Sequence, residues 1–91
     1  MEQGLIDPDR DVRAEAATLL GKLHNPDWAA PLLEPMLADS EGQVRKNAAL
    51  SLMKLQAKTS ISALEERLSQ EDQTDVQAIF NLAINQLNQA G

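Results

Sequence analysis

The sequence predicts an all-α fold, a right-handed α-solenoid of five helices in which one long helix precedes two pairs of short and long helices. The main observation is a repeat of 32 residues that aligns Val12–Leu23, Val44–Leu55 and Val76–Leu87 without a gap. A second observation is composition: Leu and Ala dominate, and Trp28 and Phe80 are the only aromatic residues. Such a composition suits closely packed helices better than a strand-rich core.

The three aligned segments share one apolar face. Equivalent apolar residues recur at i, i+4, i+8 and i+11, the spacing that draws one stripe along a helix. The four columns of this stripe are Val12, Val44 and Val76; Ala16, Ala48 and Phe80; Leu20, Leu52 and Ile84; and Leu23, Leu55 and Leu87. Each long helix is therefore expected to bury these four positions.

The first two helices are bounded by residues that favour helix ends. Asp7-Pro8 supplies an N-cap and a proline suited to the first helical position, so the first helix should run from there to about residue 24. Asn25-Pro26-Asp27 favours a turn whose Asp caps a short helix over about 28–38. Pro35 removes an interior hydrogen bond, so this helix should bend or shorten near its end.

The later helices have comparable signals. Asp39-Ser40 is expected to open the central long helix, as Asp7-Pro8 opens the first. Thr59 is the expected cap of a helix over about 60–69. Thr74 and Gln77 have the spacing of a capping box, so the last helix should begin there and fray at its C-terminal end.

One motif spans the first helix and the start of the second. It reads Asp7-Pro8-Asp9-x-x-Val12-Arg13-x-x-Ala16-Ala17-x-Leu19-Leu20-Gly21-x-Leu23, followed by Trp28-Ala-Ala-Pro31-Leu32-Leu33. This motif resembles the HEAT-like repeat named after the phycobilisome (PBS) lyases, with units at about 5–24, 27–56 and 59–88 of a single domain, 1–91. The third unit departs from the pattern at Gln77 and at Phe80-Asn81.

The resemblance implies a curved α-solenoid whose second helices line the concave face. It is specific for the fold and unspecific for function. Proteins that contain such units include bilin lyases, phycobilisome-degradation factors, regulatory tails of signalling ATPases and scaffolds.

Composition limits the classes of function. A chain of 91 residues suffices for one small domain. A net charge of −6 argues against nucleic acid as a ligand, because phosphate binding depends on clustered Lys and Arg. The absence of Cys excludes disulfides and thiolate metal sites. The chain shows no leader segment and no long apolar run, so we expect a cytoplasmic protein without membrane contacts.

The sequence offers no catalytic constellation. His24 is the only His, and no second His or Cys stands at ligand spacing, so it is expected to close the first helix. No nucleophile motif, phosphate-binding Gly loop or Ser-His-Asp set can be assembled. We therefore expect no catalytic residue, no metal and no cofactor, and a protein that is not an enzyme.

Charged residues recur with the repeat. Asp7 and Arg13, six residues apart, return as Asp39 and Arg45 and weaken to Glu71 and Gln77. A carboxylate and a guanidinium could be poised on a substrate. The alternative, which we favour, is a structural ladder in which each Asp caps its helix and each Arg bridges to a turn of the adjacent unit. Catalytic groups are rarely copied into every repeat.

The outward side of the long helices is the expected partner-binding face. Five residues there combine apolar and cationic character: Lys22, Lys46, Leu50, Lys54 and Leu82. Such a row on a concave surface suits an acidic peptide or helix. The alternative is that neighbouring helices partly cover the two Leu residues and that the Lys residues only favour solubility.

The two ends of the array differ. Four amides, Gln77, Asn81, Asn85 and Asn88, line the outer flank of the last helix, as a capping repeat requires. At the other end Met1–Ile6 is too short for a helix, so Leu19 and Leu23 lack a partner and self-association through this end is expected.

The favoured function is thus a non-enzymatic interaction or scaffold module that binds another protein or peptide. The alternative is a bilin lyase subunit or a phycobilisome-associated factor, which would need an apolar groove and cations for the propionates of a tetrapyrrole. Lys22, Lys46 and Lys54 are the candidate cations. Nucleic-acid binding is a weaker alternative because basic residues do not interleave with aromatic ones.

Overall fold

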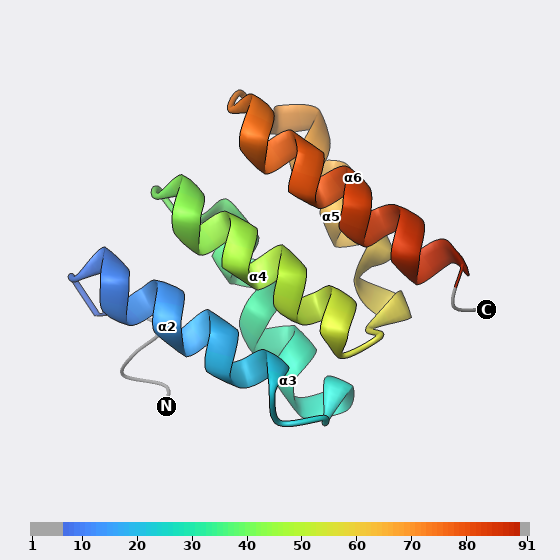
Figure 1. The fold of residues 1–91 in the computed structure, drawn as a ribbon, viewed down its shortest axis with the longest axis horizontal. Helices are drawn as coiled ribbons and strands as arrows, with labels where there is room; N and C mark the ends of the chain where they lie inside the picture. Colours follow the sequence, from blue (N-terminus) through green and yellow to red (C-terminus); the bar gives the residue numbers. More distant parts are fainter. Residues whose placement is uncertain (1–6, 90–91) are drawn as a thin grey trace.

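The computed structural model describes residues 7–89, so the expectations for Met1–Ile6 and for fraying at Ala90-Gly91 lie outside the described residues. Within this range the regular structure is entirely helical (Figure 1). The elements are α2 (Arg10–Gly21), α3 (Pro26–Leu33), the 3₁₀ helix η1 (Glu34–Ala38), α4 (Gly42–Lys54), the 3₁₀ helix η2 (Lys58–Ser60), α5 (Ile61–Gln70) and α6 (Thr74–Gln89).

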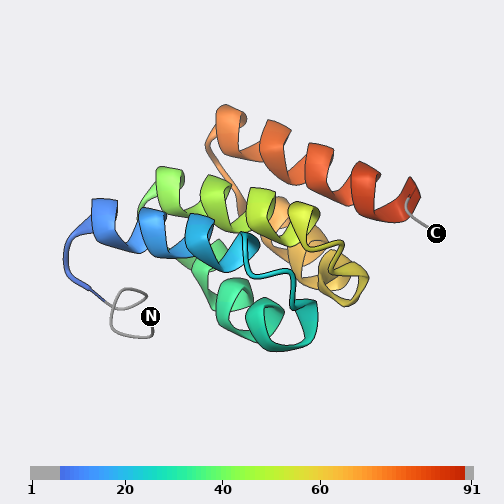
Figure 2. The ribbon, with the colours of Figure 1, turned by 60° about the horizontal axis from the view of Figure 1, so that its bottom comes forward.

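The helices form two layers. The long helices α2, α4 and α6 lie side by side with α4 in the centre, and α3 with η1 and α5 pack behind them (Figures 1 and 2). This is the expected order of one long helix and two pairs of short and long helices. The right-handed twist of the stack stays a prediction. No helix within the described range is both long enough and apolar enough to span a bilayer.

The buried core runs between the two layers. Its largest fully buried apolar side chains come from all five α-helices and η1, and include Leu20, Leu33, Leu37, Leu52, Leu64 and Phe80. Close packing of α2 on α4 relies on small residues. Ser51 Oγ donates a buried hydrogen bond of 2.6 Å to the carbonyl of Ala17, and Asn47 donates to the carbonyl of Ala14 at 3.1 Å. The backbones of these two helices therefore approach each other closely.

The α-helix is shortened before Pro35, one of the two outcomes expected from this residue. The α-helix α3 ends at Leu33, and the chain continues as the 3₁₀ helix η1 from Glu34. Pro35 has no N–H to donate into the α-helical ladder, so the tighter 3₁₀ pattern replaces it.

The expected N-caps of two long helices are wrong by two residues. Asp9, not Asp7, caps α2 by accepting a hydrogen bond from the backbone N–H of Asp11. Asp7 accepts from the backbone N–H of Asp9 at 2.8 Å, and Asp39 accepts from that of Glu41 at 2.9 Å. Both Asp side chains thus close an Asx turn just before the helix begins.

Two short helices also begin differently from the sequence expectation. Asn25, not Asp27, caps α3 by accepting a hydrogen bond of 3.3 Å from the backbone N–H of Trp28. Thr59 lies inside η2, and the following helix has Ser60 at its N-cap position without a side-chain bond. The turn before α5 is therefore closed by 3₁₀ geometry instead of a side-chain cap.

The repeat columns are buried unequally. Val44 and Val76 are fully buried, whereas Val12 in the same column is 38% exposed. Leu23 is 46% exposed, although its equivalents Leu55 and Leu87 are buried. The expectation that all three units bury the same face is therefore wrong for Val12 of α2 and for Leu23, which lies just beyond its C-terminal end. Nothing among the described residues covers this part of α2 as α3 and α5 cover the later helices.

Candidate functional site

Arg13 connects two turns of the stack. Its Nε and Nη2 donate to the two carboxylate oxygens of Asp39 at 2.8 and 3.0 Å, and its Nη1 donates to the backbone carbonyl of Asp7 at 2.8 Å. The guanidinium is thus held by a bidentate ion pair to the next unit and by a carbonyl of its own preceding turn.

Arg45 repeats this arrangement one unit later. It donates to both carboxylate oxygens of Glu71 at 2.8 and 2.9 Å, and to the carbonyl of Asp39 at 2.7 Å. The side chains of Arg45 and Glu71 are only 10% and 4% exposed. We call the contacts of Arg13 and Arg45 the arginine rungs.

Gln77 occupies the same position in the third unit. Its side-chain amide donates to the carbonyl of Glu71 at 2.6 Å. Gln77 thus keeps the hydrogen bond that each Arg makes to a carbonyl of the turn before its own helix. This bond takes the place of the expected capping box with Thr74, although α6 does begin at Thr74. Each Arg bridges to the adjacent turn in the manner expected of a ladder, whereas neither Asp7 nor Asp39 caps its helix. The structural role of these four residues stays a prediction.

The contacts of Arg13 and Arg45 lower the pKa of the Asp39 carboxyl group. Burial raises the pKa of Asp39, but the hydrogen bonds from Arg13 and from the backbone of Glu41, with the charges of Arg13 and Arg45, outweigh it. The net result is a pKa below the ordinary value of 3.8. Because the folded-state pKa is lowered, the stabilisation by Asp39 is complete above the unfolded value and is lost as pH falls through the folded one.

Replacement of Asp39 by Asn should therefore lower the free energy of unfolding at neutral pH, with a smaller effect in acid. Urea unfolding at pH 7, 4 and 3 measures the difference between the native protein and Asp39→Asn, which should narrow below pH 3.8. Asp72→Asn, in the exposed turn before α6, is the control and should change stability little. A difference for Asp39→Asn that stays constant across this range contradicts the linkage.

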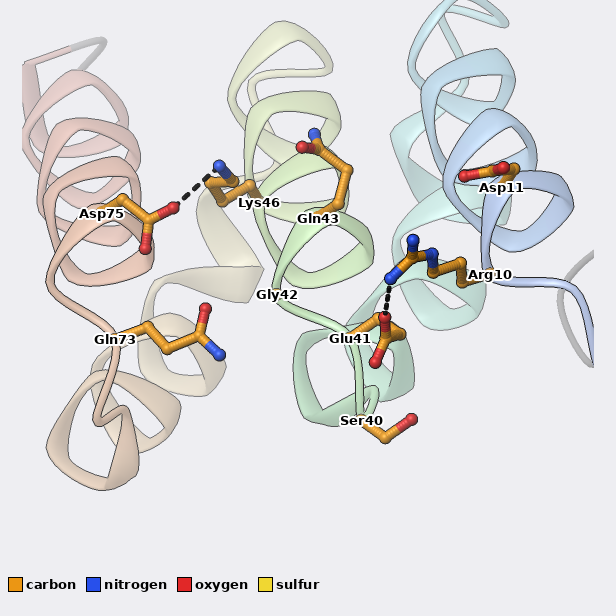
Figure 3. Close-up of a pocket in the computed structure, with 9 residues that line it drawn as sticks. All are labelled: Arg10, Asp11, Ser40, Glu41, Gly42, Gln43, Lys46, Gln73 and Asp75. Atoms are coloured by element: carbon orange, nitrogen blue, oxygen red, sulfur yellow. Dashed lines mark hydrogen bonds and ion pairs between the residues drawn. The ribbon is translucent and has the colours of Figure 1, made fainter.

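A polar hollow lies at the N-terminal ends of the three long helices (Figure 3). Its volume is about 510 Å³, and its lining includes two ion pairs. Arg10 pairs with Glu41 at 2.9 Å, and Lys46 pairs with Asp75 at 2.9 Å, which lowers the pKa of the Asp75 carboxyl. Both cations of the hollow are therefore already partnered by carboxylates.

Sequence analysis did not identify these two ion pairs. Glu41 is the N-cap residue of α4, and Asp75 lies in the first turn of α6, so each stands at the start of the long helix that follows its cation in the stack. A signal exists in the spacing, since each cation precedes a carboxylate at close to one repeat length. The signal is weak because the two ion pairs occupy different positions in the 32-residue repeat.

The five residues expected to bind a partner do not all lie at one place on the surface. Lys46 joins the hollow, whereas Lys22 and Lys54 are exposed at the C-terminal ends of α2 and α4. Leu82 is 41% exposed on α6, and Leu50 is half-buried on α4. Lys46, Leu50 and Lys54 follow one another at i, i+4 and i+8, so they form one stripe along α4. We call this stripe, together with the exposed Leu82 of the neighbouring helix α6, the α4 stripe.

The described residues contain no cluster of His, Asp and Glu that could hold a metal ion. His24 follows α2 and is exposed, with a φ of 56° in the left-handed region. This conformation is typical of the residue just beyond a helix, so His24 ends the turn after α2.

Three stacked long helices, backed by short ones and joined at their turns, define an α-helical repeat protein. Residues 1–85 match the family model described as HEAT repeats, and the chain belongs to the HEAT-repeat family.

The chain is similar to the bilin biosynthesis protein MpeU of Synechococcus sp. (strain WH8020), with 46% identity over 83 residues. The matched segment is 91% of this chain and 28% of the relative, so the chain spans less than a third of that protein's length. Together the two matches confirm the resemblance to HEAT-like repeats of the PBS lyase type. The expectation that the protein is not an enzyme is wrong, because this relative is named for a biosynthetic function.

Proposed function

We propose that this protein acts in bilin biosynthesis and that the α4 stripe binds the bilin. The observation that carries the proposal is the 46% identity to a bilin biosynthesis protein across 91% of the chain. At this level of identity the two sequences share a fold over the matched segment, and the shared segment includes the α4 stripe.

The chemistry of the stripe suits a linear tetrapyrrole. Such a molecule has a long apolar conjugated body and two propionate carboxylates. Leu50 and Leu82 offer apolar contact area, and Lys46 and Lys54 bracket Leu50 at opposite ends of the stripe. Eight residues of α-helix separate these two ammonium groups by about 12 Å along the axis.

Lys46 can exchange partners. Its present partner Asp75 has a side chain that is 61% exposed, and ion pairs of this kind contribute little to stability. A propionate that binds Lys46 therefore displaces a weak internal contact. Lys54 forms no ion pair with another described residue.

The test is a visible-absorbance titration of the protein with biliverdin as the probe. Binding should change the absorbance spectrum in a saturable manner, and Lys54→Gln should weaken the apparent affinity several-fold because one carboxylate contact is lost. Lys58→Gln is the matched control, since Lys58 is an exposed lysine on η2, outside the α4 stripe. Circular dichroism verifies that each variant is folded.

Two results contradict the proposal. One is the absence of any saturable spectral change with the native protein. The other is an equal loss of affinity in Lys54→Gln and Lys58→Gln, which would indicate general attraction of an anion without a site at the stripe.

The second candidate function is a protein-binding module, with an acidic amphipathic helix as its partner. It is favoured by an exposed Leu82 and a half-buried Leu50 on neighbouring long helices, which could supply the apolar row of a helix-binding groove. Fluorescence anisotropy of a labelled acidic helical peptide tests it, with Leu82→Glu expected to abolish binding while the fold persists. Peptide binding without a biliverdin signal would favour this function over the first.

A further inference from the structure

The flank of α2 that faces away from α4 carries an exposed apolar stripe. Val12 and Leu19 are 38% and 40% exposed and lie seven residues apart on one side of the helix, and Leu23, two residues beyond its C-terminal end, is 46% exposed. These are three of the five large apolar side chains that are exposed in the described part of the chain. A contiguous stripe of this kind is typical of a surface that binds another protein.

Charges border the stripe in a self-complementary pattern. Glu15 and Lys22 are both exposed, lie seven residues apart on the same edge of the stripe, and form no ion pair with another described residue. In an antiparallel pair of α2 helices related by a two-fold axis near Leu19, Glu15 of each copy comes opposite Lys22 of the other. The two-fold symmetry then brings two Glu15–Lys22 pairs of opposite charge together in one interface.

The other end of the stack does not fit this stripe. Asn81, Asn85 and Asn88 are exposed on the outer flank of α6. A head-to-tail stack would bury these amides against leucine side chains, which costs free energy when the amides lose water without gaining a partner. A contact between two identical apolar stripes avoids that cost and closes after two copies.

We propose that the protein forms a two-fold dimer in which α2 packs antiparallel on α2 of a second copy, through Val12, Leu19 and Leu23, with Glu15 of one copy opposite Lys22 of the other. This inference does not depend on bilin binding, because the α4 stripe uses other residues. The dimer buries a stripe on each copy that is small by the standard of stable interfaces, so the equilibrium should be concentration-dependent.

Sedimentation equilibrium of the native 91-residue chain over a wide concentration range tests the dimer. The expected result is a reversible monomer–dimer equilibrium that Leu19→Glu shifts to monomer, with at least a tenfold increase in the dissociation constant. Leu19 is already 40% exposed, so this variant should keep the fold, as circular dichroism can verify. Asn85→Glu, on the opposite end, is the matched control and should leave the equilibrium unchanged.

A charge reversal distinguishes the antiparallel arrangement from other contacts of the same stripe. Glu15→Lys and Lys22→Glu should each weaken the dimer several-fold, because each places like charges opposite one another twice. The double variant should restore the native dissociation constant. A native chain that stays monomeric throughout, a dimer that Asn85→Glu dissociates, or a double variant weaker than both single variants would each overturn the proposed arrangement.

Discussion

Replacement of Arg45 by Ala should lower the free energy of unfolding by about 3 kcal/mol, the scale for breaking a buried ion pair by removing one partner. The variant leaves the carboxylate of Glu71, whose side chain is 4% exposed, without its bidentate partner. It also removes the donor to the carbonyl of Asp39. Most of the loss arises from the charge that remains buried, because that carboxylate cannot recover its hydration.

Urea unfolding followed by circular dichroism measures this loss. Arg10→Ala is the matched control: its ion pair with Glu41 is similar in length, but its side chain is 68% exposed. Exposed pairs contribute at most about 1 kcal/mol, so the control should change stability much less. Equal losses of unfolding free energy in the two variants would show that the buried contacts of Arg45 stabilise the fold no more than the exposed ion pair of Arg10. An unchanged melting temperature together with lost ligand binding would assign Arg45 to function instead of to the stack.

Replacement of Gly21 by Ala should lower stability by about 2 kcal/mol, within the range for overpacking a close contact. A Cβ atom on Gly21 would lie 2.6 Å from Ser51 Oγ, 2.8 Å from Ser51 Cβ and 2.9 Å from Ser51 Cα. The Cα atom belongs to the backbone of α4, so relief requires the two helices to move apart. The higher helix propensity of Ala offsets at most about 1 kcal/mol of this cost.

Gly42→Ala is the control for this prediction. A Cβ atom at Gly42 would meet the side-chain oxygen of Gln73 first, and this exposed, flexible side chain can move aside. The control should therefore be close to neutral in the same urea unfolding measurement. If Gly21→Ala is also neutral, the packing of α2 on α4 tolerates a methyl group and is looser than the contact distances indicate.

The repeat of 32 residues was sufficient to predict the order and pairing of the helices. Positions such as Val44, Val76, Leu52 and Phe80 are buried as their columns predict, because each lies on a helix covered by its neighbours. Val12 and Leu23 occupy the same columns and are exposed. Periodicity identifies the apolar face of a helix, but burial also depends on what packs against that face, and this information is not contained in the residue itself.

Helix ends were harder to predict for a local reason. Asp7 and Asp39 have side chains suited both to an N-cap and to an Asx turn, and the two roles differ by only two residues along the chain. In the structure each accepts a backbone N–H two residues later and so closes the turn before the helix. Their backbone carbonyls accept hydrogen bonds from Arg13 and Arg45. The carboxylate of Asp39 also binds Arg13, a three-dimensional neighbour 26 residues away that no local pattern indicates.

The candidate site was only partly predictable. The α4 stripe follows from helix geometry, and the structure keeps Leu50 and Lys54 on it as expected. The pairing of Lys46 with Asp75 depends on the relative height of α4 and α6, which no local pattern encodes. The sequence could offer bilin chemistry only as an alternative, because a bilin has no short signature comparable to a metal or phosphate motif. The similarity to part of a bilin biosynthesis protein supports that alternative and does not contradict the interaction module.

The arginine rungs have a consequence for how the stack can lengthen. Each Arg needs a carbonyl in the turn before it and a carboxylate in the turn of the next unit. A second copy of residues 39–70 placed directly after the first would satisfy both needs, since it supplies a new Asp39 to the original Arg45 and a new Arg45 to Glu71. A copied third unit would present a carboxylate to Gln77, which has no charge to match it. Such a protein can therefore grow by duplication of its middle unit without leaving either partner of an arginine rung unpaired.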